Sequence, residues 1–309
     1  MIPPKVSVSL ITYNHEKYIA ACLDSIVKQV VDFGVEIVVS DDCSTDKTPE
    51  IVADYALKYP GLIKPVFMEK NIGMVKNALA TINACAGQYI AIMEGDDFWS
   101  DEHKLQAQAD YLDQNADCVI CYTNGYIFYE NEPSRKEFFF TPAQQPLPKI
   151  DLDSYVRYHL LIPNNTKMFR KADQPTVFPN WMYSSINWDW VLHVLQLRRG
   201  KAGYIDIVSL AYRRHAGAAF DAKNEENILL SGVSTTKAMN EYLNFKYNDS
   251  LKNLWWEYHE LALIYLRKHS PVKFLVYYAR YILSKPGTSK VRFRDELWRI
   301  KTALLSRTI

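Results

Sequence analysis

The chain has 309 residues, of which 48% are hydrophobic and 23% are charged, and this composition excludes disordered and fibrous proteins. The net charge of +1 hides an asymmetry, because residues 267–309 hold eleven Lys or Arg and two acidic residues, a net of +9. Residues 1–266 then hold 25 basic and 33 acidic residues, a net of −8. The basic tail predicts an anionic partner.

The sequence pattern predicts neither a targeting segment nor a membrane-spanning one. The longest apolar runs, residues 261–266 and 274–279, have six residues each, whereas a spanning helix needs about 20. The amino terminus does not resemble a signal peptide, and the five scattered cysteines suit a reducing compartment. We therefore expect a cytoplasmic protein.

The first 125 residues alternate between strand-like and helix-like segments. Apolar patterns predict strands at residues 6–12, 36–40, 63–68, 89–93 and 118–122, and helices at residues 16–29, 49–58, 74–85 and 103–114. Strands about 30 residues apart that are joined through helices form right-handed βαβ units. The fold class is therefore α/β, with a mainly parallel sheet flanked by helices.

The pattern changes after residue 125. Four prolines in residues 130–149 predict a loop. A helix is then expected at residues 152–160, a strand at 165–169, a helix at 189–198 and strands at 202–207 and 209–213. From about residue 227 the sequence is helical. The chain is thus divided into residues 1–125, residues 126–224 and a helical C-terminal extension, residues 225–309.

Polar side chains follow each of the first four strands. They include Thr12, Tyr13 and Glu16 after the first strand, Asp42 and Asp46 after the second, Asn71 and Gly73 after the third, and Glu94, Gly95, Asp96 and Asp97 after the fourth. Ligands of open α/β sheets bind beyond the carboxyl ends of the strands. Because converging carboxylates repel one another, we predict a divalent cation, Mn²⁺ or Mg²⁺, shared with a phosphate.

The glycines exclude two nucleotide-binding classes. No two glycines stand two residues apart, so the GxGxxG fingerprint of dinucleotide-binding proteins is absent. No Gly-Lys-Ser or Gly-Lys-Thr sequence supplies a P-loop. Neither hydride transfer nor P-loop ATP hydrolysis is therefore supported.

Residues 5–125 closely resemble the inverting family 2 glycosyltransferases of the GT-A fold. The resemblance rests on four motifs in the family's order and spacing: VSVSLITYNHEKYIAACLDSIVKQ, EIVVSDDCSTDKT, NIG and GQYIAIMEGDDFW. The later run INWDWVLHVLQLRRGKAGYIDIVSLAYRRHAG is similar to the family's acceptor-binding half. The resemblance implies transfer of a sugar from a nucleotide diphosphate donor, a UDP-sugar, to an acceptor hydroxyl with inversion. It also implies a role in polysaccharide or O-antigen assembly.

The resemblance assigns roles in donor binding. Thr12, Tyr13 and Glu16 would surround the base and ribose, Asp42 would accept the uracil N–H, and Asn71 and Gly73 would edge the pocket. Within Glu94-Gly95-Asp96, the last residue takes the position that binds the metal on the diphosphate. Glu94 takes the position near the ribose, where the family usually has Asp.

The second half supplies the remaining assignments. Asp189 falls on the family's catalytic base, and inverting transfer does need a carboxylate that accepts the hydroxyl proton. Trp188 and Trp190 could raise its pKa and stack on a sugar; alternatively, Asp189 caps a helix beside two core tryptophans. His215 is expected to contact the metal or the diphosphate. Arg213 and Arg214 are expected to supply positive charge for the diphosphate. The alternative is that these three are ordinary surface residues.

Other functions and partners remain open. A nucleotide-sugar-binding module without transfer activity is one alternative, and a sugar-phosphate nucleotidylyltransferase is another, although the Gly-rich loop of that class is missing. In the tail, two apolar stripes would pack onto the catalytic domain, a homodimer partner or an anionic inner-membrane surface. The stripes are Val272, Leu275, Val276, Ala279, Ile282 and Leu283, and Phe293, Leu297, Ile300 and Leu304. Nucleic acid is not expected, because the catalytic face is acidic.

Overall fold

The computed structural model describes residues 4–175, 177–215 and 225–284. Its strands are β1 (Val6–Thr12), β2 (Val35–Asp41), β3 (Ile63–Phe67), β4 (Tyr89–Glu94), β5 (Phe98–Trp99), β6 (Cys118–Tyr129), β7 (Glu132–Phe138), β8 (Lys149–Ile150), β9 (Met168–Arg170) and β10 (Lys201–Arg214). Its helices are α1 (Ile19–Val27), α2 (Thr48–Lys58), α3 (Met74–Ala84), α4 (Lys104–Gln114), α5 (Leu152–Arg157), α6 (Trp188–Leu197), α7 (Glu225–Tyr242), α8 (Asn248–His269) and α9 (Pro271–Ser284). Three short 3₁₀ helices are η1 (Asn164–Thr166), η2 (Lys171–Asp173) and η3 (Asn180–Ser184).

The strands form one sheet in the order β3-β2-β1-β4-β9-β6-β10-β5, with β7 added to β6 and β8 to β10. The pairs β1–β2, β1–β4, β2–β3 and β6–β10 are parallel. Strand β9 is antiparallel to both of its neighbours, β4 and β6. The predicted α/β class with a mainly parallel sheet is thus confirmed, and the sheet runs without a break through the region where the sequence suggested a boundary.

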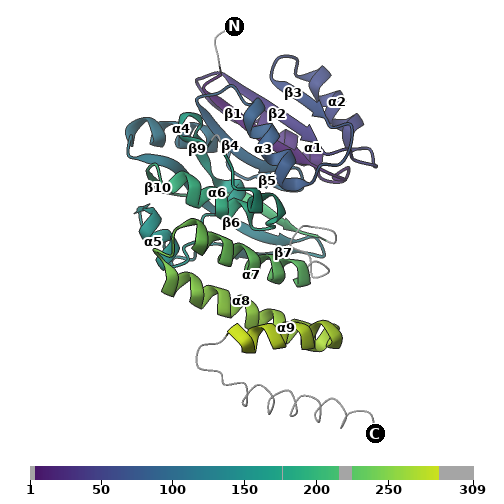
Figure 1. Ribbon diagram of the computed structural model, residues 1–309. Coiled ribbons are helices and arrows are strands. Elements are labelled where there is room, and N and C mark those ends of the chain that lie inside the picture. Colours follow the sequence, from purple (N-terminus) through teal and green to yellow (C-terminus); the bar gives the residue numbers. More distant parts are fainter. Residues whose placement is uncertain (1–3, 176, 216–224, 285–309) are drawn as a thin grey trace.

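Helices cover both faces of the sheet (Figure 1). Successive side chains of a strand point to opposite faces. In β1, Val8 and Leu10 accordingly join a core with Leu23 of α1, whereas Ile11 joins a second core with Leu79 of α3. The second core also takes in α5 and α6. Burial on both faces explains why the strands are almost continuously apolar.

The prediction of a loop at residues 130–149 was wrong in part. Strand β7 occupies residues 132–138 and pairs antiparallel with the end of β6, and β8 pairs with β10. Among the described strands, β7 pairs with β6 alone, and a strand at such an edge tolerates a proline. The prolines of this segment therefore occur both in an edge strand and in segments without regular structure.

Two other expectations about strands also need correction. The strands expected at residues 202–207 and 209–213 are one strand, β10, whose pairing with β6 shifts register between Ile205 and Val208 and again between Val208 and Leu210. Such irregularities break the alternation of side chains along a strand. The strand expected at residues 165–169 begins only at Met168, because the preceding residues form η1.

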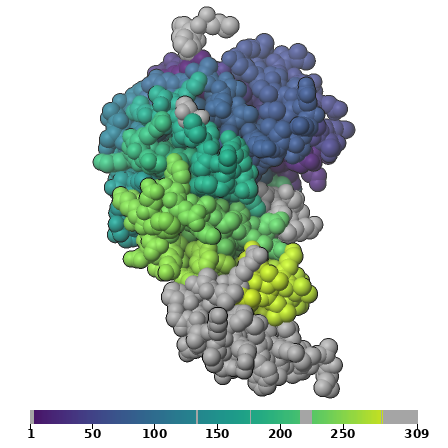
Figure 2. Space-filling view, in the orientation of Figure 1, coloured from purple at the N-terminus to yellow at the C-terminus, as the bar shows by residue number. Residues whose placement is uncertain are grey.

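The C-terminal helices form a stack below the sheet in Figures 1 and 2, with α8 between α7 and α9. Met239 of α7 and Leu251 of α8 belong to the core that also holds α6. Helix α9 packs Phe274 and Tyr281 against Leu266 of α8. Helices α7 and α8 are therefore attached to the core that holds α5 and α6, and α9 is attached to α8.

Two residues of the apolar stripe predicted on α9 lie on the surface, because Val272 is 76% exposed and Val276 is 52% exposed. A homodimer partner and an anionic membrane surface remain predictions for this stripe. The second stripe, from Phe293 to Leu304, lies outside the described residues. Within the part of the chain that the structure describes, none of the helices combines the length and the apolar character needed to span a bilayer.

Candidate active site

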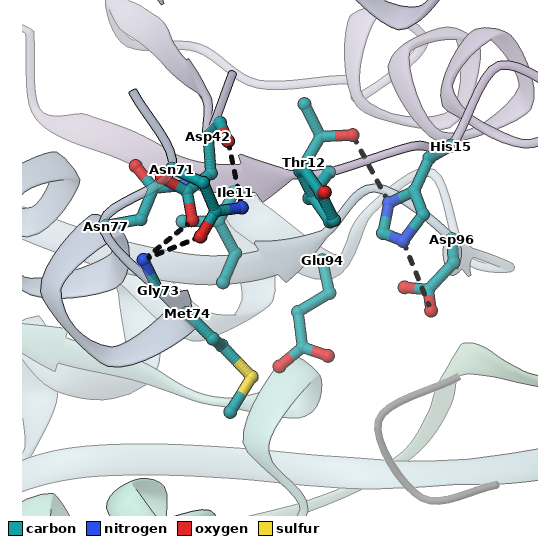
Figure 3. Close-up of a pocket in the computed structure, with 11 residues that line it drawn as sticks. Ile11, Thr12, His15, Asp42, Asn71, Gly73, Met74, Asn77, Glu94 and Asp96 are labelled. Atoms are coloured by element: carbon teal, nitrogen blue, oxygen red, sulfur yellow. Dashed lines mark hydrogen bonds and ion pairs between the residues drawn. The ribbon is translucent and has the colours of Figure 1, made fainter. Parts of the chain in front are cut away.

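A cavity of about 330 Å³ opens where the polar residues after β1, β2 and β4 meet. In Figure 3, Asp42, Asn71 and Gly73 lie at one end, His15 and Asp96 lie at the other, and Glu94 lies between them. The cavity is lined by Ile11, Thr12, Tyr13, His15, Asp42, Asn71, Gly73, Met74, Asn77, Glu94 and Asp96. The structure therefore brings together the strand ends that the sequence pointed to.

Asp42 fixes the turn that leads into α3. Its two carboxylate oxygens accept the backbone N–H groups of Ile72, at 2.8 Å, and Gly73, at 3.0 Å. Gly73 has a φ of 87°, a left-handed conformation that favours glycine. Because each carboxylate oxygen has two lone pairs, Asp42 retains acceptor capacity for a ligand N–H.

Of the residues predicted at the end of β1, two line the cavity and one does not. Thr12 and Tyr13 line the cavity, and Tyr13 is 43% exposed. Glu16 is not among the lining residues; its carboxylate accepts the N–H of Lys47, at 3.1 Å, and its own N–H donates to Asp46, at 3.0 Å. These contacts place Glu16 against the start of α2.

Gly95 is required by the close approach of β4 to the loop after β1. A Cβ atom on Gly95 would lie 2.7 Å from Oγ1 of Thr12 and 3.0 Å from Nδ1 of His15. The Gly95 N–H also donates to the carbonyl of Ile11, at 2.9 Å. The middle residue of the acidic motif thus lets its two carboxylate neighbours line the cavity beside Thr12.

Asp96 lies between two histidines. Nε2 of His215 lies 3.1 Å from Oδ2 of Asp96, and Nε2 of His15 lies 3.8 Å from the same oxygen. Burial would raise the pKa of Asp96, but the hydrogen bond with His215 and the charge of His15 hold it below its usual value. Asp96 is therefore ionised at neutral pH, as a metal ligand must be.

The donor set at Asp96 fits a hard divalent cation only if the substrate completes it. Among the described residues, no group of three or more His, Cys, Asp or Glu side chains is arranged to hold a metal ion. Mg²⁺ is usually held by one or two carboxylates together with substrate phosphates. Asp96 and His215 are the residues that would supply the protein's share.

Two asparagines that the sequence analysis missed hold the neighbouring acids. Asn164 donates to Glu94, at 3.1 Å, and Asn165 donates to Asp97, at 2.6 Å. Burial and the charge of Asp96 raise the pKa of Glu94 to about 8 and raise that of Asp97 well above its usual value. Asp97 is 1% exposed, so its role is to organise the motif from within.

Arg213 supports Asp96 from behind the cavity. Its Nε donates to the carbonyl of Asp96, at 2.9 Å, and its guanidinium lies 4.8 Å from the ring centroids of both Tyr18 and Phe128. The Tyr18 ring also contacts that of His215, with centroids 4.5 Å apart. Arg213 is not among the residues that line the cavity. Its observed contacts hold the acidic motif in place.

Asp189 lies in the first turn of α6, next to this site. The N-cap position is Asn187, so the interpretation of Asp189 as the cap was wrong, whereas Trp188 is indeed a core residue, 2% exposed. Burial raises the pKa of Asp189, while the charge of Lys167 and the N–H of Trp190 oppose that rise. The negative charge of Asp189 in turn raises the pKa of Glu94.

A second cavity, of about 210 Å³, adjoins the first. The two share Gly73 and Met74, and the second is also lined by Ile72, Val75, Lys76, Tyr183, Ser184, Ser185 and Ile186. Tyr183 and Ser184 belong to η3, which directly precedes α6 and Asp189. This space is therefore bounded by the start of α3 and by the segment that leads into α6.

The chain belongs to glycosyl transferase family 2, whose family model matches residues 7–187. A Mycobacterium tuberculosis relative, "Uncharacterized protein Rv1520", is 33% identical over 211 residues, which are 68% of this chain and 59% of the relative. The chain thus spans about 59% of that relative's length. "Putative teichuronic acid biosynthesis glycosyltransferase TuaG" of Bacillus subtilis is 28% identical over 139 residues, 45% of this chain and 54% of TuaG.

Solved structures show the same fold. Residues 1–349 of S. aureus TarS in complex with UDP-GlcNAc match 91% of this chain and 82% of that chain, with a TM-score of 0.61 and 20% identity. The Pyrobaculum calidifontis mannosyltransferase PcManGT in complex with GDP-Man and Mn²⁺ matches 99% and 81%, with a TM-score of 0.53 and 15% identity. The predicted GT-A-like fold with C-terminal helices is confirmed.

Proposed function

We propose that the chain transfers a sugar from a nucleotide diphosphate donor, most simply a UDP-sugar, to an acceptor hydroxyl with inversion at the anomeric carbon. The observation that carries this proposal is the continuity of the first cavity, which joins the hydrogen-bonding end at Asp42 to the acidic end at Asp96. A nucleoside diphosphate has the matching polarity, with a hydrogen-bonding base at one end and phosphates at the other.

The donor would lie along this cavity. Thr12, Tyr13 and Asn71 would surround the base and ribose, and an oxygen of Asp42 would accept the base N–H. The diphosphate would lie near Asp96, which with His215 would hold Mn²⁺ or Mg²⁺. When bound, such an ion supplies positive charge that stabilises the leaving diphosphate.

Asp189 would act as the base. As the acceptor oxygen forms its bond to the anomeric carbon, the hydroxyl proton passes to the Asp189 carboxylate. The bond between that carbon and the diphosphate oxygen breaks at the same time, and its electron pair leaves with the nucleotide. Burial raises the pKa of Asp189, which makes its carboxylate a stronger base. The second cavity, beside Tyr183, is our proposed entry for the acceptor.

We further propose that the enzyme works at the cytoplasmic membrane surface on a lipid-linked glycan. The name of TuaG refers to teichuronic acid biosynthesis, which supports a role in polysaccharide assembly. On this chain, Val272 and Val276 are exposed on α9, and the last turn of α8 holds Arg267 and Lys268. Exposed apolar side chains beside basic ones suit a bilayer that contains anionic lipid.

A panel of nucleotide sugars tests the proposed function. The full chain is incubated with each of them, with and without Mn²⁺, and release of the nucleoside diphosphate is measured. Consumption of one donor, with a product of inverted anomeric configuration by NMR, is expected. If no nucleotide sugar is bound or consumed, the chain is not a transferase of this kind.

A further inference from the structure

We propose that Lys167 is a positioning residue that acts through its charge: a buried cation behind the active site that keeps the Asp189 carboxylate ionised and ready to accept a proton. This inference rests on the proposed function, because it concerns the base of the proposed transfer. Lys167 was not singled out by the sequence, and neither cavity is lined by it.

Lys167 is an amine in a place where packing alone would favour an apolar side chain. The residue is 0% exposed, between η1 and β9. Its Nζ lies 2.8 Å from Nε2 of His193, and Nδ1 of His193 lies 2.9 Å from the hydroxyl of Tyr155. These three side chains form a buried hydrogen-bonded chain. Burial of an amine is costly unless the group is hydrogen-bonded and, when charged, paired with an opposite charge.

Helix α6 brings this chain to the base. Asp189 and His193 are four residues apart on α6, so their side chains lie on the same face of the helix. Lys167, which contacts His193, therefore lies against the face that carries Asp189. The Nζ atom also lies 5.9 Å from the ring centroid of Trp188, the residue that precedes Asp189.

The electrostatics agree with this placement. Burial lowers the pKa of Lys167 to about 7, and the charges of Asp189 and Glu94 oppose that fall. Reciprocally, the charge of Lys167 opposes the rise that burial causes in the pKa of Asp189. Lys167 thus favours the ionised carboxylate of Asp189, whereas burial disfavours it.

Four described groups interact electrostatically with Asp189: Lys167 before β9, Glu94 on β4, Tyr155 on α5 and Tyr258 on α8. A fifth group, His193, lies on the same face of α6. Burial lowers the pKa of His193 well below its usual value, so it is neutral. Glu94 and the tyrosines have no cationic form. Among these groups, Lys167 is therefore the cation.

The effect has a defined pH range. Because the pKa of Lys167 is about 7, its charge is present below pH 7 and is lost as the pH rises above that value. At low pH the ionised form of Asp189 depends on the positive charge of Lys167. At high pH the carboxylate is ionised without that charge. Removal of Lys167 should therefore harm transfer most under acidic conditions.

The chain offers a matched control in Lys104. Lys104 is also 0% exposed, burial also lowers its pKa to about 7, and its Nζ donates to Gln108, at 2.5 Å. The charges that act on it are those of Cys121 and Asp101, not that of Asp189. Loss of this lysine also removes a buried amine, but it does not remove a charge that acts on Asp189.

The experiment compares Lys167→Met, Lys167→Gln and Lys104→Met with the wild type between pH 5.5 and 9. For both Lys167 variants we expect kcat/KM to be lower by about tenfold or more at the acidic end and to approach the wild type at pH 9, since one pKa unit is worth a factor of ten. Lys104→Met should keep the wild-type profile. The glutamine variant, which is polar and of similar length, guards against misfolding of the methionine variant.

A second measurement does not need turnover. Infrared spectra are recorded over a range of pH for each protein and for the same protein with Asp189→Asn. The difference between the two spectra reports protonation of the Asp189 carboxyl group. We expect that group to protonate at higher pH in the Lys167 variants than in the wild type. An unchanged titration, or a loss of kcat/KM that is equal at every pH, would overturn the proposal for Lys167. Absence of transfer by the wild type would instead reject the proposed function and leave the titration result standing.

Discussion

The Nε2 atom of His215 lies 3.1 Å from Oδ2 of Asp96, although the two residues are 119 positions apart. Asp96 follows the carboxyl end of β4, and His215 follows that of β10. Both strands run in the same direction, because β6 pairs parallel with β10 and is separated from β4 by the antiparallel β9. The proposed metal-binding pair is thus assembled by the alignment of distant strands at one edge of the sheet.

This relationship predicts the effect of Asp96→Ala. Loss of the carboxylate should reduce the Mn²⁺-dependent affinity for UDP at least about tenfold, because loss of even an outer-shell partner of a metal ligand costs that much. Calorimetric titration with UDP, with and without Mn²⁺, measures this. Asp206→Ala, on the exposed part of β10, is the control and should bind as the wild type. Equal affinities for Asp96→Ala and the control would remove Asp96 from the metal site.

The first half of the fold was predictable from the sequence. Strand β1 was predicted with its observed bounds, and α3 and β4 were predicted to within one residue at each end. Their buried apolar periodicity is local, so it can be read without knowledge of the neighbours. The convergence of Asp42, Asn71 and Asp96 followed from the rule for parallel strand ends.

The remainder depends on long-range pairing. Asn164 and Asn165 reach the acidic motif only because β9 inserts beside β4, some 75 residues away in sequence, and no local pattern marks that insertion. Lys167 was missed for the same reason. His15 had a signal, since it follows the end of β1 within the same motif as Thr12 and Tyr13, but its role depends on its distance from Asp96.

Gly95 allows a test of the local geometry. The substitution Gly95→Ala would place a methyl group 2.7 Å from Oγ1 of Thr12. We expect a loss of about 1–3 kcal/mol in the free energy of unfolding, the usual cost of overpacking, and weaker UDP binding because Thr12 must move. Thermal unfolding and calorimetry measure the two effects. A control is Gly61→Ala, whose cost is conformational, because no atom lies within 4 Å of its added methyl group. Unchanged UDP affinity in Gly95→Ala would show that Thr12 does not shape the donor site.

The exposed face of α9 predicts membrane association. Val272→Gln combined with Val276→Gln removes apolar contact while the basic residues remain, so binding of the full chain to vesicles with anionic lipid should fall. Binding of the wild type should also weaken as salt rises, because salt screens the attraction. Co-sedimentation measures both effects. Equal pelleting of variant and wild type, or a dimer in solution that the substitutions dissociate, would contradict the bilayer as the occupant of this face.

We propose that Asp189 takes the proton of the acceptor hydroxyl in a single displacement. Asp189→Asn keeps the size of the side chain and removes its basicity, so transfer should fall by roughly 10² to 10⁴-fold. The affinity for UDP should stay near the wild-type value, because the base meets the acceptor and not the nucleotide. Asp173→Asn, a half-exposed carboxylate in η2, is the matched control and should keep full activity.

The most direct measurement is therefore the rate of sugar transfer by Asp189→Asn, taken together with its UDP affinity, once the donor is known from the nucleotide-sugar panel. We expect a large loss of transfer with donor binding intact. A rate within a factor of a few of the wild type would contradict it and would transfer the role of base to another carboxylate.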